Sequence, residues 1–206
     1  MPTIAGLAAK LPAATGPVGL AFPAVVKGGK ARTAANIDHA WIGADGAALI
    51  RRTLDRNALF LNDADAAGLA EMRLGAGRGV RGAVVMLTFG TGIGSALFLD
   101  GKLVPNTELG HLEMRGKDAE QRASAKVRDD KDLSWEDWAA RVQEYLALVE
   151  KLFSPDLVIV GGGVSKHPEK FLHFQSLRAH IVPAEMANDA GIIGAALAAR
   201  SHHHHA

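Results

Sequence analysis

Apolar runs and helical patterns alternate along most of the chain. Short runs of β-branched and large aliphatic residues, bounded by Gly, Pro or Asp, predict buried strands. The predicted strands cover 18–22, 58–61, 83–88, 93–99, 103–104 and 157–160. Capping signals and helical spacing predict helices over 45–54, 63–73, 134–153 and 190–199. Because strands alternate with helices, the expected fold class is α/β.

The longest helical pattern begins at Ser134 and ends at Phe153. Ser134 is followed three residues later by Asp137, which is a capping-box arrangement. One face of this helix is apolar, through residues 135, 138, 139, 142, 146, 149 and 153. Such a stripe is typical of a packed core rather than of a cofactor site. Upstream, Asp100-Gly101 between two predicted strands indicates a tight hairpin.

Composition narrows the class of protein. The chain has 206 residues, of which 48% are hydrophobic and 22% charged, and this balance excludes a disordered chain. Lys plus Arg number 23 against 22 Asp plus Glu, so the basic excess of a nucleic-acid binder is missing and no nucleic-acid partner is expected. The sequence has no cysteine, which excludes disulfides and thiolate zinc sites and fits a reducing, cytoplasmic location.

No membrane segment is expected either. The longest run without charge, 82–99, is interrupted by glycines and threonines, which indicates two strands and a turn rather than a spanning helix. The residues after Met1 lack the basic and apolar regions of a secretory signal. Residues 201–206 are rich in His and resemble a tag or a tail, so they do not enter the fold or metal arguments.

Asn62 and Asp63 lie where a predicted strand passes into a predicted helix. Open α/β sheets bind ligands at the carboxyl ends of their strands, so Asp63 is a candidate general base toward a hydroxyl group. Asn62 is then a candidate for orienting the substrate. The alternative is that one of the two residues merely caps the helix, and the local pattern alone favours capping.

Two glycine clusters are candidate phosphate-binding segments. Gly90-Thr91-Gly92 lies between two strands, where backbone N–H groups can approach an anion and Thr91 adds a hydroxyl donor. Because this turn joins two strands, it fits neither a Rossmann fingerprint nor a Walker loop. Gly161-Gly162-Gly163 ends a buried strand and would let a flat ring or a phosphate lie against the backbone. A purely structural turn is an equal alternative for each cluster.

Acidic groups and an imidazole gather further along the chain, at Glu108, His111 and Glu120. Carboxylates accept hydrogen bonds from two hydroxyls at once, so these residues are candidates for holding a sugar. A metal site is not expected, because His111 has neither thiolates nor a second histidine nearby. Simple surface exposure is the alternative for Glu120. The basic residues within 117–131 alternate with acidic ones, which favours a solvated face over a track for a long anion.

Taken in order, these four motifs resemble the ROK family of sugar kinases, and within it the polyphosphate-using glucokinase branch. The supporting runs are RTAANID at 32–38 with Trp41, LNDADAAG at 61–68 and PNTELGHLE at 105–113. The resemblance implies an actin-like, hexokinase-type (RNase H-like) fold of two domains. Residues 1–62 would form the remainder of the small N-terminal domain, 63–200 the large C-terminal domain and 201–206 a tag-like tail.

The resemblance also implies an activity, phosphoryl transfer from polyphosphate or ATP to the 6-hydroxyl of glucose, with Asp63 as general base. The sugar ligands would be Asn62, Glu108, His111 and Glu120. The donor would be held by Gly90, Thr91 and Gly92, and its nucleotide by Gly161, Gly162 and Gly163. Mg²⁺ would bridge the donor phosphates. No zinc is expected, since the cysteine cluster of zinc-containing relatives is missing, and the family usually forms homodimers.

One family motif is missing from this sequence. The family opens with an Asp-x-Gly-Gly-x-x-x-Lys phosphate loop between two strands, and no such motif occurs here. The chain begins at a segment that resembles the helix after that hairpin, so the resemblance implies a helix over 2–11. We therefore expect a chain truncated at its N-terminus, with an unpaired sheet edge and weakened phosphoryl transfer. The alternative is an inactive glucose-binding remnant of such a kinase. A ROK-type transcription regulator is disfavoured, because it needs a helix-turn-helix before the kinase-like part.

Overall fold

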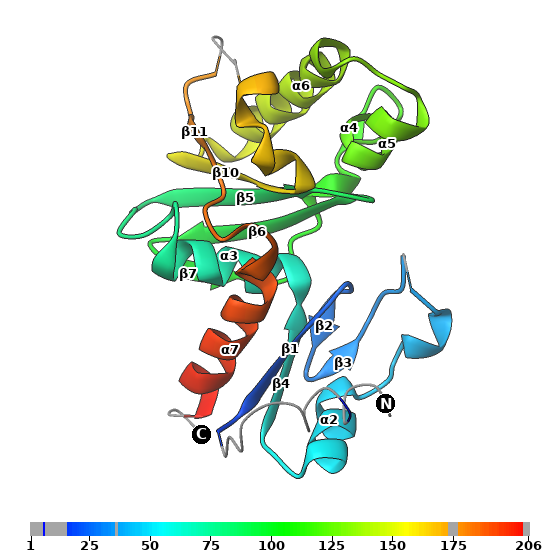
Figure 1. The fold of residues 1–206 in the computed structure, drawn as a ribbon, viewed down its shortest axis with the longest axis vertical. Coiled ribbons are helices and arrows are strands. Elements are labelled where there is room, and N and C mark those ends of the chain that lie inside the picture. The colour runs from blue at the N-terminus through cyan, green and yellow to red at the C-terminus, as the bar shows by residue number, and fades with distance from the viewer. Residues whose placement is uncertain (1–5, 7–15, 36, 173–176, 204–206) are drawn as a thin grey trace.

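The computed structural model describes residues 6, 16–35, 37–172 and 177–203, and its fold is built on two sheets (Figure 1). The larger sheet has five strands in the order β11-β10-β5-β6-β7, and the smaller has two, β1-β4. Two further ladders, β2-β3 and β8-β9, have two strands each. The helix predicted over 2–11 lies outside the described residues except for Gly6.

The strands are β1 (Val18–Phe22), β2 (Val26–Lys27), β3 (Lys30–Ala31), β4 (Ala58–Asn62), β5 (Ala83–Phe89), β6 (Ile93–Leu99), β7 (Lys102–Val104), β8 (Glu113–Met114), β9 (Lys117–Asp118), β10 (Leu157–Gly162) and β11 (His180–Pro183). The α-helices are α2 (Gly46–Leu54), α3 (Asp63–Leu74), α4 (Glu120–Ala123), α5 (Ala125–Asp130), α6 (Trp135–Phe153) and α7 (Ala190–His203). Short 3₁₀ turns include η2 (Leu109–His111) and η3 (Gly163–Lys166). Among the described helices, none combines the length and the apolar character needed to cross a bilayer.

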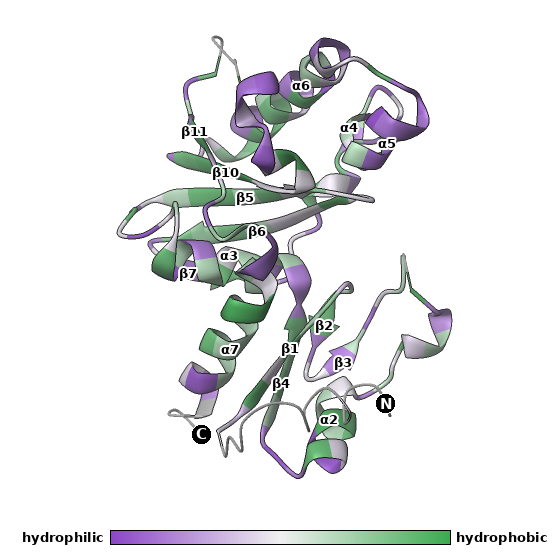
Figure 2. Cartoon of the chain, in the orientation of Figure 1, coloured by the Kyte–Doolittle hydropathy of each residue, from purple (hydrophilic) through white to green (hydrophobic). Residues whose placement is uncertain are grey.

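The five-stranded sheet is buried on both faces. Successive residues of β5 point to opposite sides of the sheet, and those on each side pack in a separate hydrophobic cluster. Val85, Leu87 and Phe89 pack in one cluster with the apolar face of α6. Val84 and Met86 pack in another cluster with α3 and the start of α7. Figure 2 shows the resulting hydrophobic strands β5 and β10 between more polar outer elements.

The smaller sheet is covered on one side by α7. Strands β1 and β4 run parallel, and α7 packs against both. Small residues make this close packing possible: a Cβ added at Gly19 would lie 2.0 Å from the carbonyl oxygen of Ala195. Within the described part of the chain, β1 has β4 as its only strand partner. The domain boundary between residues 62 and 63 stays a prediction. Helix α7 belongs by sequence to the predicted large domain, yet it packs against β1 and β4 of the small sheet.

Most predicted elements are confirmed within one or two residues, and β1 and β6 have the predicted bounds. Helix α6 begins at Trp135, and the Ser134 side chain caps it by accepting a hydrogen bond from the N–H of Asp137. Two elements run two or more residues further than predicted. Strand β10 continues through Gly162, because its pairing with β5 extends to that residue. Helix α7 continues to His203, so the beginning of the predicted tail is helical.

Candidate active site

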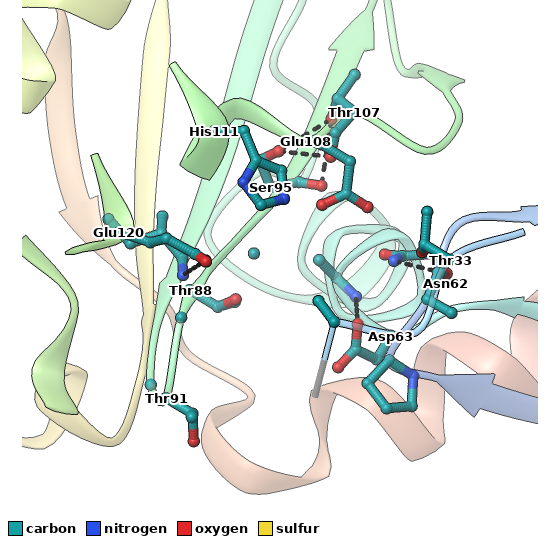
Figure 3. A pocket seen from close by; sticks show the side chains of 18 of the residues that line it. Thr33, Asn62, Asp63, Thr88, Thr91, Ser95, Thr107, Glu108, His111 and Glu120 are labelled. Carbon is teal, nitrogen blue, oxygen red and sulfur yellow. Dashed lines mark hydrogen bonds between the residues drawn. The ribbon is translucent and has the colours of Figure 1, made fainter. Parts of the chain in front are cut away.

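A cleft of about 600 Å³ lies between the small sheet and the large one (Figure 3). The segments 23–24 and 33–35 line it on the small-sheet side, together with the start of α3. On the opposite side lie the turn between β5 and β6, the segment 107–108 and His111. The cleft brings together nine of the predicted site residues: Asn62, Asp63, Gly90, Thr91, Gly92, Glu108, His111, Glu120 and Gly162.

Asn62 and Asp63 take different roles at the start of α3. The Asn62 side chain is the N-cap: its Oδ1 accepts from the N–H of Asp65 at 2.9 Å, and its Nδ2 donates to the carbonyl of Ala24 at 3.1 Å. Asp63 faces the cleft, and its Oδ1 accepts from the N–H of Ala64 at 2.9 Å. Loss of hydration between the cleft walls raises the pKa of Asp63, which makes this carboxylate a stronger base than an ordinary aspartate.

Glu108, His111 and Glu120 converge on the same space from η2 and α4. Glu120 Oε2 accepts a hydrogen bond from the N–H of Ile93 at 3.2 Å, so one of its oxygens is anchored. His111 Nδ1 lies 2.9 Å from Asp118 Oδ2, and this contact is the main cause that raises the pKa of His111. Desolvation raises the pKa of Glu108, and the nearby His111 opposes that shift.

One group of side chains has the donor set of a cation site. His111, Asp118 and Glu120 each present a ligand atom, and the three atoms lie within 4.8 Å of one another. The sequence pattern around His111 did not reveal this arrangement, because Asp118 reaches His111 only through the β8-β9 hairpin. Gly116, which has a φ of 74° at the hairpin turn, was the residue in the sequence that could have indicated a turn between His111 and Asp118.

The glycine turn, Gly90-Thr91-Gly92, is an ordered hairpin tip. The N–H of Gly90 donates to the carbonyl of Gly92 at 3.0 Å, and the carbonyl of Gly90 accepts from the N–H of Lys126 at 3.0 Å. Thr91 is exposed at the tip and lines the cleft. The turn therefore presents its backbone and one hydroxyl to any ligand that enters.

The three glycines after β10 are not equivalent. Gly161 is buried within the strand and lines neither the cleft nor the adjoining cavity. Gly162 has a φ of 86°, and a Cβ there would lie 2.3 Å from the carbonyl oxygen of Phe89, so this position needs glycine. Gly163 lines a second cavity of about 550 Å³, which shares the glycine-turn residues Gly90 and Thr91 with the cleft.

The second cavity is lined by both charged and aromatic side chains. Lys126 pairs with Asp130 at 2.9 Å and Arg128 with Asp129 at 2.7 Å. The Arg128 guanidinium also lies 4.0 Å from the centre of the Trp135 ring. Pairing within the helix agrees with the predicted solvated face, yet Lys126 and Arg128 also line a cavity that continues from the cleft.

Comparison with known proteins identifies the family. The sequence pattern of the ROK family matches residues 1–132. The chain belongs to the ROK family. It is 49% identical over 184 residues to a polyphosphate glucokinase of Mycobacterium tuberculosis (strain CDC 1551 / Oshkosh), a match that covers 89% of this chain and 69% of that protein. It is also 49% identical to a polyphosphate glucokinase of Mycobacterium leprae, covering 89% of this chain and 57% of that protein.

A solved structure agrees with this assignment. The inorganic polyphosphate/ATP-glucomannokinase of Arthrobacter sp. strain KM superposes on the ROK chain with a TM-score of 0.93 and 50% identity. The match covers 97% of this chain and 81% of that one. The resemblance to ROK sugar kinases and the actin-like, hexokinase-type fold predicted from it are thus confirmed.

Proposed function

We propose that this chain transfers a phosphoryl group from polyphosphate or ATP to the 6-hydroxyl of glucose. The observation that carries the proposal is the cleft itself, where the carboxylate of Asp63 and the Glu108, His111 and Glu120 side chains face one space that ends at the glycine turn. The names of the relatives, polyphosphate glucokinase and polyphosphate/ATP-glucomannokinase, support the choice of acceptor and donor.

The acceptor sugar would lie between Asp63 and the acidic side chains opposite. Glu108 and Glu120 supply carboxylate oxygens that accept from sugar hydroxyls. With Nδ1 of His111 held by Asp118, its Nε2 is the ring nitrogen that faces a ligand. The amide nitrogen of Asn62 carries two N–H groups. One donates to the carbonyl of Ala24, and we assign the other to the sugar.

Asp63 would act as the general base. The 6-hydroxyl oxygen attacks the terminal phosphorus, the bond from that phosphorus to the donor's bridging oxygen breaks, and the hydroxyl proton passes to the Asp63 carboxylate. The raised pKa of Asp63 favours accepting this proton. Most of the catalysis in such a transfer comes from positioning and charge stabilisation.

The donor would approach from the side of the glycine turn. Backbone groups of Gly90 to Gly92 and the Thr91 hydroxyl would hold the terminal phosphate, and the second cavity with Lys126 and Arg128 would take the remainder. Gly162 and Gly163 border this route, whereas buried Gly161 shapes the strand behind it. The lining is rich in oxygen ligands, which fits Mg²⁺, and Mg²⁺ bound with the donor supplies neutralisation of phosphate charge.

The test is glucose 6-phosphate formation by the purified chain with glucose, Mg²⁺ and either polyphosphate or ATP. We expect Asp63→Asn to lower kcat by about 10²–10⁴-fold. Asp55→Asn is the matched control, since it changes an exposed carboxylate at the C-cap of α2. Turnover that survives Asp63→Asn would contradict the role of Asp63. A chain that binds glucose without turnover would support the inactive remnant instead.

A further inference from the structure

Asn106 joins the two sides of the cleft. It follows β7 and precedes the segment that carries Glu108, whereas Val26 belongs to β2 on the small-sheet side. The Asn106 Oδ1 accepts from the N–H of Val26 at 2.6 Å, and its Nδ2 donates to the carbonyl of Val26 at 2.9 Å. One amide side chain thus takes the place of a neighbouring strand beside β2.

The side chain of Asp65 binds the backbone of Asn106. Its Oδ2 accepts a hydrogen bond from the backbone N–H of Asn106 at 2.8 Å, and its own N–H is bonded to the Asn62 cap. The residue is 2% exposed. Its Oδ1 is buried and has no hydrogen-bond partner within the described part of the chain. A buried carboxylate with one unsatisfied oxygen costs free energy, so stability alone does not explain this side chain.

The backbone at Asn106 and Thr107 is held by hydrogen bonds to two neighbouring elements. Asn106 has a φ of 60°, a left-handed conformation that asparagine tolerates better than most residues. Next to it, the carbonyl of Thr107 accepts from the Ser95 hydroxyl at 2.7 Å. The segment leading to Glu108 is therefore attached to β6 by Ser95 and to α3 by Asp65.

We propose that Asp65 and Asn106 are positioning residues that set the distance between the two sides of the sugar cleft. Asp65 fixes the backbone of Asn106, Asn106 fixes Val26, and Glu108 is thereby held opposite Asp63. This inference rests on the proposed function for the identity of the ligand. Its structural part, that the link restrains both sides of the cleft, holds for any ligand.

Asn106→Gly tests the link directly, because glycine keeps the left-handed backbone and removes only the amide. We expect KM for glucose to rise about tenfold, as expected for the loss of two ordinary hydrogen bonds. KM for the phosphoryl donor should change less than twofold. Ser154→Gly is the matched control, since Ser154 also has a left-handed φ, 44°, but caps α6 away from the cleft.

Substitutions at Asp65 separate positioning from general stability. Asp65→Asn retains an oxygen that can accept from the Asn106 N–H, so KM for glucose should stay within threefold of the unmodified chain. Asp65→Ala removes that oxygen and should match Asn106→Gly. The double variant should be no worse than either single one, because both break the same link. Additive effects, or equal rises of KM for glucose and for the donor, would overturn the proposal.

Hydrogen exchange without any sugar separates this inference from the proposed function. Asn106→Gly should speed amide exchange in the segment 24–31, and Ser154→Gly should leave that segment unchanged. Unchanged exchange in Asn106→Gly would refute the link whatever the ligand is. If the unmodified chain neither binds nor phosphorylates glucose while exchange responds as expected, the proposed function fails and the link between the two sides stands.

Discussion

Glu120 and Ile93 are joined by a hydrogen bond of 3.2 Å, from the backbone N–H of Ile93 to the carboxylate of Glu120. This bond holds the first residue of α4 against the end of the glycine turn. A Cβ added at Gly92 would lie 2.4 Å from the same Glu120 oxygen. The turn and the carboxylate therefore share one small space, which no side chain larger than hydrogen can enter at position 92 without displacing Glu120.

Gly92→Ala is expected to weaken glucose binding with little effect on folding. The added methyl group meets the flexible end of Glu120, so the carboxylate moves while the backbone stays in place. We expect the Kd for glucose, measured by isothermal titration calorimetry, to rise about tenfold, the equivalent of one lost hydrogen bond to a charged group. The melting temperature should fall by only a few degrees, about what 1 kcal/mol causes in a domain of this size.

Gly90→Ala is the comparison for this prediction. A Cβ at Gly90 has no atom within 4 Å, and the residue belongs to the same turn. We expect its Kd for glucose to stay within twofold of the unmodified chain. Equal losses in the two variants would show that neither glycine of the turn tolerates a side chain, and Glu120 would then not be the reason for Gly92.

The pH dependence of kcat/KM should report Asp63. Because loss of hydration raises the pKa of this carboxylate, the acid limb should have its midpoint above the value of about 3.9 for an ordinary aspartate. Activity should be lost as the pH falls through that midpoint, since a protonated base accepts no proton. A midpoint at or below 3.9, measured by initial rates across pH 3.5–8, would contradict the assignment.

Asp65 should make the protein less stable as the pH rises. Burial raises the pKa of Asp65 to about 6 in the folded chain, so the folded state binds its proton more tightly than the unfolded state does. The stabilising contribution is complete below pH 3.8 and is lost as the pH rises through 6. Asp65→Asn removes this titration.

We therefore expect the free energy of unfolding of Asp65→Asn, relative to the unmodified chain, to be higher at pH 7.5 than at pH 5. The expected difference is about 1.4 kcal/mol, the equivalent of one pKa unit. Urea unfolding at the two pH values measures it. A difference between the two chains that does not change with pH would mean that Asp65 titrates as an ordinary aspartate.

Glu71 should be a strong determinant of stability. It is fully buried in α3, and its two carboxylate oxygens accept from the N–H of Ala76 at 3.0 Å and of Met186 at 2.7 Å. In Glu71→Gln the amide nitrogen must face one of these donors. We expect a loss of about 2 kcal/mol in the free energy of unfolding. Glu185→Gln, an exposed change close to Met186, should cost less than about 0.5 kcal/mol.

The regular elements were predictable because each carries its own signal. The apolar run of β1, the strand predicted over 93–99 (β6) and the Ser134 cap of α6 have local signals, and all three are confirmed. Short elements such as α4 and α5 were not predicted, since they are polar and too short for a helical period to appear. Their structure depends on contacts such as Trp138 Nε1 donating to the carbonyl of Ala123.

The sequence located the candidate site but did not decide the role of each residue in it. The junction at Asn62 and Asp63 was recognised, while the choice between a cap and a ligand stayed open. The structure divides the two roles, with Asn62 as the cap and Asp63 facing the cleft. Asp118, Asp65 and Asn106 were not predicted as site residues, because their partners lie elsewhere in the chain, at His111, Asn106 and Val26 respectively.

By itself, the sequence determined the α/β pattern, the order of motifs that identifies the ROK family and the set of residues able to bind a sugar and a phosphate. Only the tertiary structure decided which of these residues share one cleft, that Gly161 is buried while Gly162 and Gly163 border open space, and that Asn106 connects the two sides. The physical reason is the separation along the chain over which each kind of interaction acts. Periodicity and capping act over a few residues, whereas a cleft is made by hydrogen bonds and packing between segments that only folding brings together.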